Sequence, residues 1–322
     1  MKTLQQRKER VAILSVASNS SLVLFKVIVG VVIGSVSIIS EAIHSGMDLL
    51  AAIIAMFSVK TSSLPADDRH PFGHGKIENI SGFVEAVLIF IAAFWIVFEA
   101  LKKLNSSQVI EYAGWGVVVM FFSSGVNYIV SRKLFQVGKK ADSIALQADA
   151  WHLRTDVYTS AGVMAGLGII WIGHEFSPAS DIRWIDPVAA LFVAVLILHT
   201  AYNLTVRSFR DLLDVKLPPE EEDCIRNIII SNQPAINGFH HLRTRKAGNI
   251  RFVEFHIKVD PQMSVLDSHN ITEGLEQNIR QKFPESAINI HIEPCDGECE
   301  DMCAAGCLLS EEKKPRGLKS TP

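Results

Sequence analysis

Two stretches decide the fold: residues 38–60, IISEAIHSGMDLLAAIIAMFSVK, and residues 144–173, IALQADAWHLRTDVYTSAGVMAGLGIIWIG. Each is long and apolar enough to cross a bilayer, which takes roughly 20 mostly apolar residues in an α-helix. Each also contains a histidine followed four residues later by an aspartate, and residues four apart share one face of a helix. Polar groups at helical spacing inside an apolar segment indicate a helix that faces the interior of a membrane bundle.

Four further apolar segments complete the pattern. They lie at 11–34, 81–103, 113–131 and 186–208, and hydrophobic residues make up 48% of the chain. Lysine and arginine collect in the N-terminal segment and in the loops after the second and fourth segments, and they are sparse in the other loops. Since positively charged loops stay in the cytoplasm, we predict a bundle of six transmembrane helices in the cell (inner) membrane, with both termini cytoplasmic.

The composition changes near residue 212, where the apolar runs end and charge returns. The patterns that follow predict a helix, two strands, a helix and a strand, at 219–232, 239–246, 250–259, 264–283 and 287–293. We therefore predict a transmembrane domain over residues 1–212 and a small cytoplasmic α+β domain, αββαβ in order, over residues 213–295. The polar segment 296–322 is expected to be disordered.

The two His-x-x-x-Asp pairs are His44 with Asp48 and His152 with Asp156. If they face each other, they offer two imidazoles and two carboxylates, a set that suits tetrahedral zinc. The alternative is that they are hydrogen-bonding partners between helices, but an aspartate in mid-membrane costs roughly 2.5–3.5 kcal/mol and is rarely without function. Because these ligands must lose protons to bind metal, a site opened alternately to each side exchanges metal for protons.

The C-terminal domain contains five of the 11 histidines of the chain. Strand alternation places His256, in the second strand, and His291 and Glu293, in the last strand, opposite the apolar face. If those strands are neighbours, the three side chains converge on one ion, and His240 and His269 could complete the set. The alternative is a group of solvated strand histidines, but their concentration in a short domain favours metal.

The two HxxxD pairs, the segment DDRHPFGHGKIE at 67–78 and HLRTR at 241–245 together resemble the cation diffusion facilitators. Within that family the chain is most similar to bacterial zinc/cadmium/iron-type exporters, over residues 8–295. The resemblance implies a homodimer of six-helix subunits with a metallochaperone-like cytoplasmic domain, which exports divalent metal from the cytosol by proton antiport. It also implies that the four HxxxD ligands form the transport site, in the combination usually associated with zinc. Fe²⁺, Cd²⁺ and Co²⁺ remain alternative substrates, since they accept the same ligands.

The resemblance implies two further metal sites. One maps onto Asp67, His70 and His74 in the loop between the second and third helices, with Asp68 as an alternative to Asp67. Without the resemblance, this loop reads equally well as a polar loop shaped by Pro71 and Gly73. The other is a binuclear cytoplasmic site, which falls on the C-terminal histidines and Glu293. Because the family often has aspartate where this chain has His241, the ligand set there stays open.

Near the C-terminus, Cys295, Cys299, Cys303 and Cys307 recur every four residues. On a helix, neighbouring thiols at this spacing share one stripe and could chelate a soft metal as thiolates. The alternative is a cysteine-bearing tail without function, because this spacing is not a standard zinc motif.

Two other functions compete with metal transport. An intramembrane zinc hydrolase would need an HExxH motif, but after His174 and Glu175 the position of the second histidine holds Pro178. A membrane-anchored metal sensor would account for the soluble domain but not for the repeated intramembrane pairs. No basic patch with interleaved aromatic residues predicts nucleic-acid binding. We therefore predict a secondary active transporter that engages metal ions, protons and the lipid bilayer, and not an enzyme.

Overall fold

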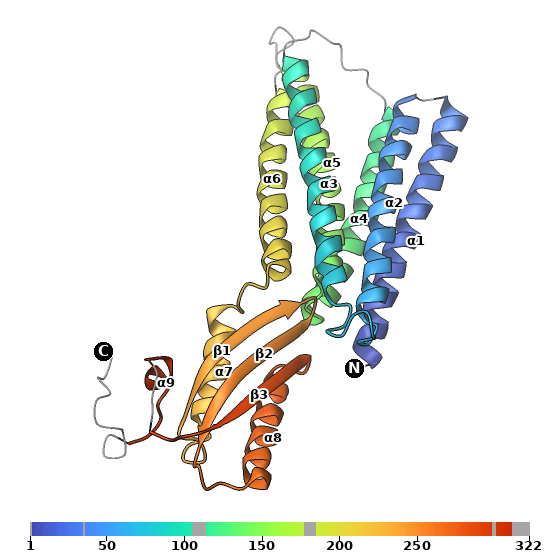
Figure 1. Cartoon of the computed structure of the whole chain (residues 1–322). Helices are drawn as coiled ribbons and strands as arrows, with labels where there is room; N and C mark the ends of the chain where they lie inside the picture. Colours follow the sequence, from blue (N-terminus) through green and yellow to red (C-terminus); the bar gives the residue numbers. More distant parts are fainter. Residues whose placement is uncertain (1, 35, 105–113, 177–184, 298–300, 311–322) are drawn as a thin grey trace. The chain divides into compact units, whose positions relative to one another are not determined.

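The computed structural model describes residues 2–34, 36–104, 114–176, 185–297 and 301–310, and the chain divides into two compact units (Figure 1). The first unit, Met1–Leu212, is a helical bundle, and the second, Leu213–Pro322, contains a three-stranded sheet. The division falls where the charge pattern of the sequence changes.

In the described part of the first unit there are six long helices, which confirms the number predicted from the apolar segments. They are α1 (Lys2–Ile33), α2 (Val36–Ser62), α3 (Lys76–Leu104), α4 (Gly114–Lys140), α5 (Ile144–Phe176) and α6 (Ile185–Leu212). Among the described residues, α1, α2, α3 and α6 are long and apolar enough to cross a membrane by composition alone. The other two helices, α4 and α5, carry more polar side chains, and α4 continues through basic residues past the predicted end of its span.

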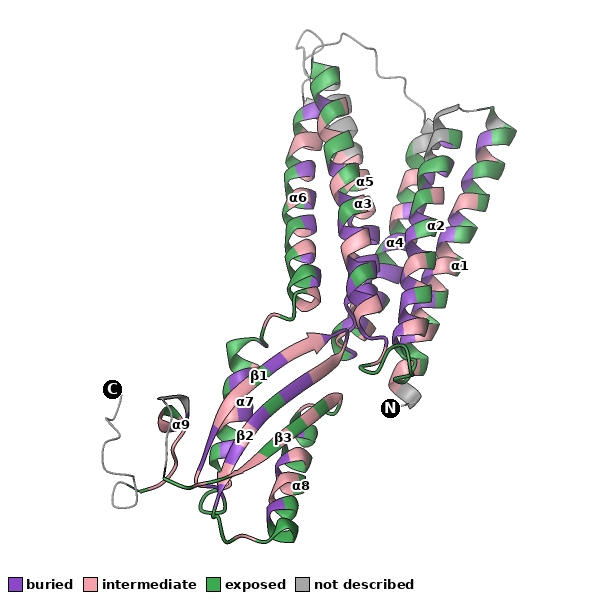
Figure 2. Ribbon diagram, viewed as in Figure 1, coloured by how far each residue is buried: buried purple, intermediate pink, exposed green. Residues whose placement is uncertain are grey.

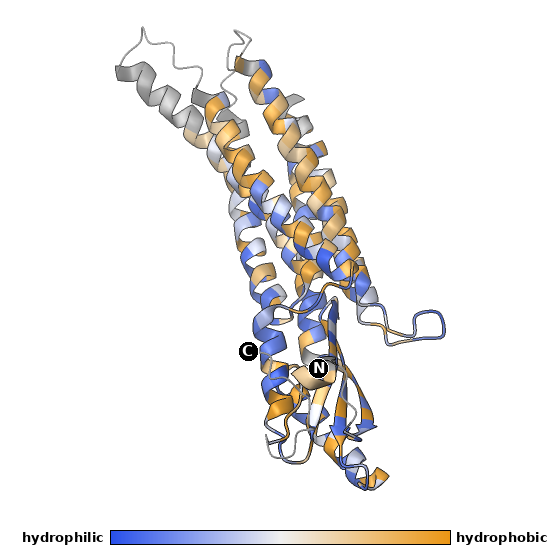
Figure 3. Ribbon diagram, turned by 60° about the vertical axis from the view of Figure 1, so that its left-hand side comes forward, coloured by the Kyte–Doolittle hydropathy of each residue, from blue (hydrophilic) through white to orange (hydrophobic). Residues whose placement is uncertain are grey.

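Unlike a water-soluble protein, the bundle exposes many of its large apolar side chains and buries many small ones. Large apolar side chains such as Val32, Trp95 and Phe121 are 80%, 69% and 71% exposed, and apolar residues cover the outer faces of the helices (Figure 3). The buried faces instead contain small residues, including Ala51, Ala55 and many other alanines (Figure 2). Small residues let helix backbones approach closely where lipid surrounds the bundle, so this pattern is typical of a membrane domain.

One buried carboxylate ties together four helices at one end of the bundle. Glu78, on α3, is fully buried and forms an ion pair with the Lys8 ammonium on α1. The same carboxylate accepts hydrogen bonds from Ser62 Oγ on α2 and from Ser143 Oγ, just before α5. Burying a charge is tolerated when it is paired and hydrogen-bonded in this way.

The second unit has the predicted element order. Helix α7 (Pro219–Ile230) precedes strands β1 (Gly238–Ala247) and β2 (Ile250–Val259), then helix α8 (Val265–Lys282) and strand β3 (Ser286–Pro294) follow. The strands lie in the order β1-β2-β3, with β1 antiparallel and β3 parallel to β2. The apolar face of β2 packs with α7 and α8 in one core, to which Ile225, Phe255 and Leu275 belong. The opposite face is left to polar side chains.

Part of the segment expected to be disordered is ordered. Residues Asp301–Ala305 form a short helix, α9, and Cys307 forms a β-bridge with Gly238 at the free edge of β1. Polar composition signals the lack of a core, whereas this segment is held by backbone hydrogen bonds to an edge strand. Residues 298–300 and 311–322 of the predicted tail lie outside the described part of the chain.

Candidate metal sites

The two HxxxD pairs meet between α2 and α5. The Nε2 atom of His152 lies 3.1 Å from Oδ1 of Asp48, which links the two helices directly. Ligand atoms of His44, Asp48 and Asp156 all lie within 4.8 Å of one another. The structure thus brings the four predicted residues to one place: His44, Asp48 and Asp156 are close enough to share one metal ion, and His152 joins them through Asp48.

The four side chains line a cavity of about 710 Å³ within the bundle. Asp48 and His152 are buried, Asp156 is half-buried and His44 is exposed, so the group extends from the interior of the bundle to its surface. Ser123, Ser124 and Asn127 of α4 and Thr155 and Thr159 of α5 also contribute to the lining. These neutral polar groups line the cavity with hydrogen-bond donors and acceptors.

A lysine that the sequence analysis missed lines the same cavity. Lys26, on α1, is only 5% exposed, and its Nζ atom donates a hydrogen bond of 2.7 Å to Oγ of Ser45. Ser45 follows His44 directly, so the ammonium lies beside the ligand group. The sequence pattern that could have revealed it is a lysine within a long apolar segment, since such a lysine is rarely without a partner or a function.

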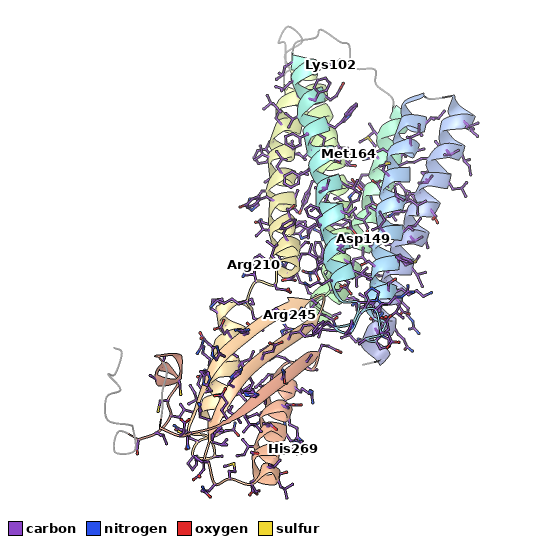
Figure 4. The ribbon with its side chains drawn as sticks, viewed as in Figure 1. Lys102, Asp149, Met164, Arg210, Arg245 and His269 are labelled. Carbon is purple, nitrogen blue, oxygen red and sulfur yellow. The ribbon has the colours of Figure 1, made fainter. Side chains whose placement is uncertain are left out.

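Two further acids are fully buried in the bundle. These are Asp149, on α5 (labelled in Figure 4), and Glu85, on α3. Within the described part of the chain, no hydrogen-bond partner is found for either carboxylate. In particular, Asp149 does not hydrogen-bond to the nearby His152. The Nδ1 atom of His152 likewise has no hydrogen-bond partner among the described residues.

The loop between α2 and α3 gathers the second predicted group. Asp67 Oδ1 lies 3.1 Å from His70 Nδ1, and Asp67 Oδ2 lies 3.5 Å from His74 Nε2. The carboxylate also accepts backbone N–H bonds from His70 and Arg69, which lower the pKa of Asp67 and keep it ionised. The Nδ1 atom of buried His74 has no hydrogen-bond partner in the described structure. The carboxylate in this three-residue group is that of Asp67, not that of the alternative, Asp68.

Glu293 is the centre of the third group, on the polar face of the sheet. Its carboxylate lies 2.8 Å from His256 Nδ1, 3.4 Å from His240 Nε2 and 3.8 Å from His291 Nε2. The Lys258 ammonium pairs with it at 3.0 Å. Burial opposes ionisation of Glu293, but hydrogen bonds from Lys258 and His256 outweigh it and lower the pKa to about 2.

The environment of His240 favours the neutral form of its imidazole ring. Burial lowers the pKa of His240, against the opposing effect of the Glu293 carboxylate. A histidine must be neutral to bind metal. The group therefore presents an ionised carboxylate next to an imidazole that resists protonation.

His241 joins this group although strand alternation would point it to the other side. The register of β1 against β2 shifts between His240 and Arg243, and His241 has a left-handed φ of 52°. This β-bulge turns the His241 ring to 4.9 Å from His240 and 5.0 Å from His256, measured between ring centroids. The adjacent histidines His240 and His241 suggested that both belong to the group, but no sequence pattern predicts the bulge.

His269 is not part of this group in the single chain. It lies on α8, 62% exposed, with its Nε2 atom 3.5 Å from Glu273 Oε1 (Figure 4). The helices cover the apolar face of the sheet, whereas the histidine group lies on the polar face. The single chain therefore does not bring His269 to this group, and its place in the set stays a prediction.

Comparison with known proteins identifies the family. A model of the cation efflux transmembrane domain matches residues 12–213, and a model of the cytoplasmic domain of cation efflux proteins matches residues 217–295. The chain belongs to the cation diffusion facilitator family. It is therefore a multi-pass membrane protein that transports metal cations and not an enzyme, as its sequence predicted.

Relatives align along most of their length. An uncharacterized transporter of Synechocystis is 32% identical over 286 residues, which cover 88% of this chain and 90% of that protein. The cation-efflux pump FieF of Citrobacter koseri is 31% identical over 286 residues, covering 89% and 92%.

Solved structures match a smaller part of the chain. The metal-bound C-terminal domain of the CzcD transporter from Thermotoga maritima is 28% identical, covers 26% of this chain and 100% of its own, and has a TM-score of 0.23. The zinc form of the transporter CzrB is 37% identical, covers 26% and 96%, and has a TM-score of 0.24.

Proposed function

We propose that this transporter exports a divalent transition metal, zinc above all, from the cytosol in exchange for protons. The observation that carries the proposal is the meeting of His44, Asp48, His152 and Asp156 in one cavity within the bundle. Two nitrogen and two carboxylate ligands suit zinc, cadmium, cobalt and ferrous iron better than magnesium or calcium, which prefer oxygen alone.

Proton exchange follows from the chemistry of the same four groups. The hydrogen bond between His152 and Asp48 places one proton between two ligands. A metal ion takes the lone pairs that share this proton, so binding must release it. When the cavity opens to the other side, protonation of the same groups expels the metal. Alternating access then couples export to proton entry.

The two groups outside the membrane helices serve as additional metal sites in this proposal. Asp67, His70 and His74 would receive metal in the loop, and His240, His256, His291 and Glu293 would hold it in the cytoplasmic domain. We infer that the chain works as a homodimer in the cell (inner) membrane with both termini in the cytoplasm, as its loop charges indicate.

Uptake of zinc into proteoliposomes tests the transport site. We expect Asp156→Ala and Asp48→Ala to lower the initial uptake rate to background, because losing one of four ligands opens the metal shell. Asp223→Ala, which removes an exposed carboxylate from α7, is the matched control and should transport like the wild type. Wild-type rates in both site variants would show that the site is misplaced, and zinc binding without uptake by the wild type would favour a sensor.

A further inference from the structure

The cysteine segment after β3 is fastened to the free edge of β1. The Phe239 amide donates to the Gly306 carbonyl at 3.0 Å, and the Leu308 amide donates to the Asn237 carbonyl at 2.9 Å. Gln233 Nε2 adds a hydrogen bond of 2.6 Å to the Leu308 carbonyl. Bonds on both sides of the contact fix the register of residues 306–308 against this strand.

Glycine is required where the two backbones meet. A Cβ atom on Gly306 would lie 1.7 Å from the Phe239 carbonyl oxygen, so any side chain there would force the segment away. A Cβ on Gly238 would lie 3.0 Å from the Gly306 carbonyl oxygen. The close approach therefore depends on the glycine at position 306, which lies between the last two cysteines of the repeat.

This attachment places Cys307 on the face of the sheet that carries the histidine group. Cys307 pairs with Gly238, Gly238 with Lys258, and Lys258 with Glu293, which makes one row across the sheet. Residues in one row share a face, so Cys307 belongs to the polar face that carries Glu293. Glycine at position 238 leaves the row without a side chain between Cys307 and Lys258.

Cys303, in α9, lies beside this contact: its carbonyl accepts a hydrogen bond of 3.2 Å from the Gly306 amide, and the residue is only 9% exposed. In addition, His240 is 8% exposed at its side chain, and its Nδ1 atom has no hydrogen-bond partner in the described structure.

We propose that Cys303 and Cys307 add thiolate ligands to a metal ion bound at His240, His256 and Glu293. The site would then combine nitrogen, oxygen and sulfur, and it would favour zinc and cadmium over manganese, because thiolates select softer ions. The proposal rests on the cytoplasmic site of the proposed function. It does not depend on transport through the membrane site.

Cobalt titration of the full-length protein in detergent, with a phosphine reductant, tests this proposal. Thiolate ligands give bound Co²⁺ an intense sulfur-to-metal absorption in the near ultraviolet, which histidine and carboxylate ligands do not. The five cysteines of the chain all lie outside the apolar segments, so metal in the membrane site gives no such band. We expect the band in the wild type and its loss in Cys303→Ser with Cys307→Ser. Cys224→Ser, on α7, is the matched control and should retain it.

Two further variants test the attachment and the shared ligands. Gly306→Ala keeps every cysteine but removes the close contact with β1, so the band should weaken. His256→Ala should weaken it too, whereas thiols that bind metal independently of the sheet would be unaffected. The proposal is overturned if the band survives the double serine variant, or if both Gly306→Ala and His256→Ala bind cobalt like the wild type. Zinc uptake measured on the same preparations keeps this result separate from that of the membrane site.

Discussion

At the scale of single residues, Lys26 adds a positive charge to the cavity lined by the two HxxxD pairs. Its ammonium lies in the same cavity as Asp48 and Asp156 and is held by Ser45. A fixed positive charge partly neutralises the two carboxylates when the cavity contains no metal, and it opposes the binding of a divalent cation. The lysine would therefore prevent zinc from binding so tightly that release becomes slow.

Lys26→Met should tighten zinc binding on the order of tenfold, since a charge removed at several ångströms inside a protein changes the free energy by a few kcal/mol at most. Calorimetry on the purified protein measures the affinity, and uptake assays should show a lower KM together with a lower kcat. Lys26→Arg keeps the charge and should restore wild-type values, and Ser45→Ala separates the hydrogen bond from the charge. Unchanged or weaker zinc binding in Lys26→Met would contradict this role.

At the scale of secondary-structure elements, the Glu78 network fixes the ends of the helices that carry the sites. It joins α1, α2, α3 and the start of α5 through Lys8, Ser62 and Ser143. Because α2 and α5 carry the two HxxxD pairs, the distance between the pairs depends on this anchor. The network was not predicted from the sequence, because its members are far apart in the chain and share no spacing.

Glu78→Ala should destabilise the bundle by about 3–5 kcal/mol, because it leaves the Lys8 ammonium buried without its partner. The melting temperature in detergent measures the loss. Lys8→Met combined with Glu78→Leu removes both charges and should recover much of it, since a buried ion pair can often be replaced by apolar side chains. If Glu78→Ala melts within one degree or so of the wild type, the carboxylate is not an anchor.

The helices and strands themselves were predictable, since their apolar periodicity reflects what each face contacts. The meeting of the two HxxxD pairs was predictable for a related reason: a repeat of His and Asp four residues apart fixes their common face. Three features could not be predicted from the sequence. The bulge at His241, the edge contact at Gly306 and the position of Lys26 beside Ser45 all depend on tertiary contacts between backbones or distant residues. No local pattern encodes such contacts.

At the scale of the whole molecule, membership in a family of cation efflux transporters and the four-ligand cavity lead to one central claim. We propose that zinc movement in one direction is tied to proton movement in the other, because the same His and Asp side chains can bind either. The second unit, with its histidine and cysteine groups, would then respond to cytosolic metal rather than carry it across the membrane. Coupling at the membrane site therefore has to persist when the cytoplasmic ligands are altered.

Simultaneous recording of zinc uptake and lumenal pH in proteoliposomes tests this claim most directly. With an acidic lumen, the wild-type protein should concentrate zinc inside the vesicles while the lumen becomes more alkaline. An ionophore that collapses the pH gradient should stop this accumulation, and Asp156→Ala should abolish both signals together. Zinc accumulation that is indifferent to the pH gradient and moves no protons would contradict the account.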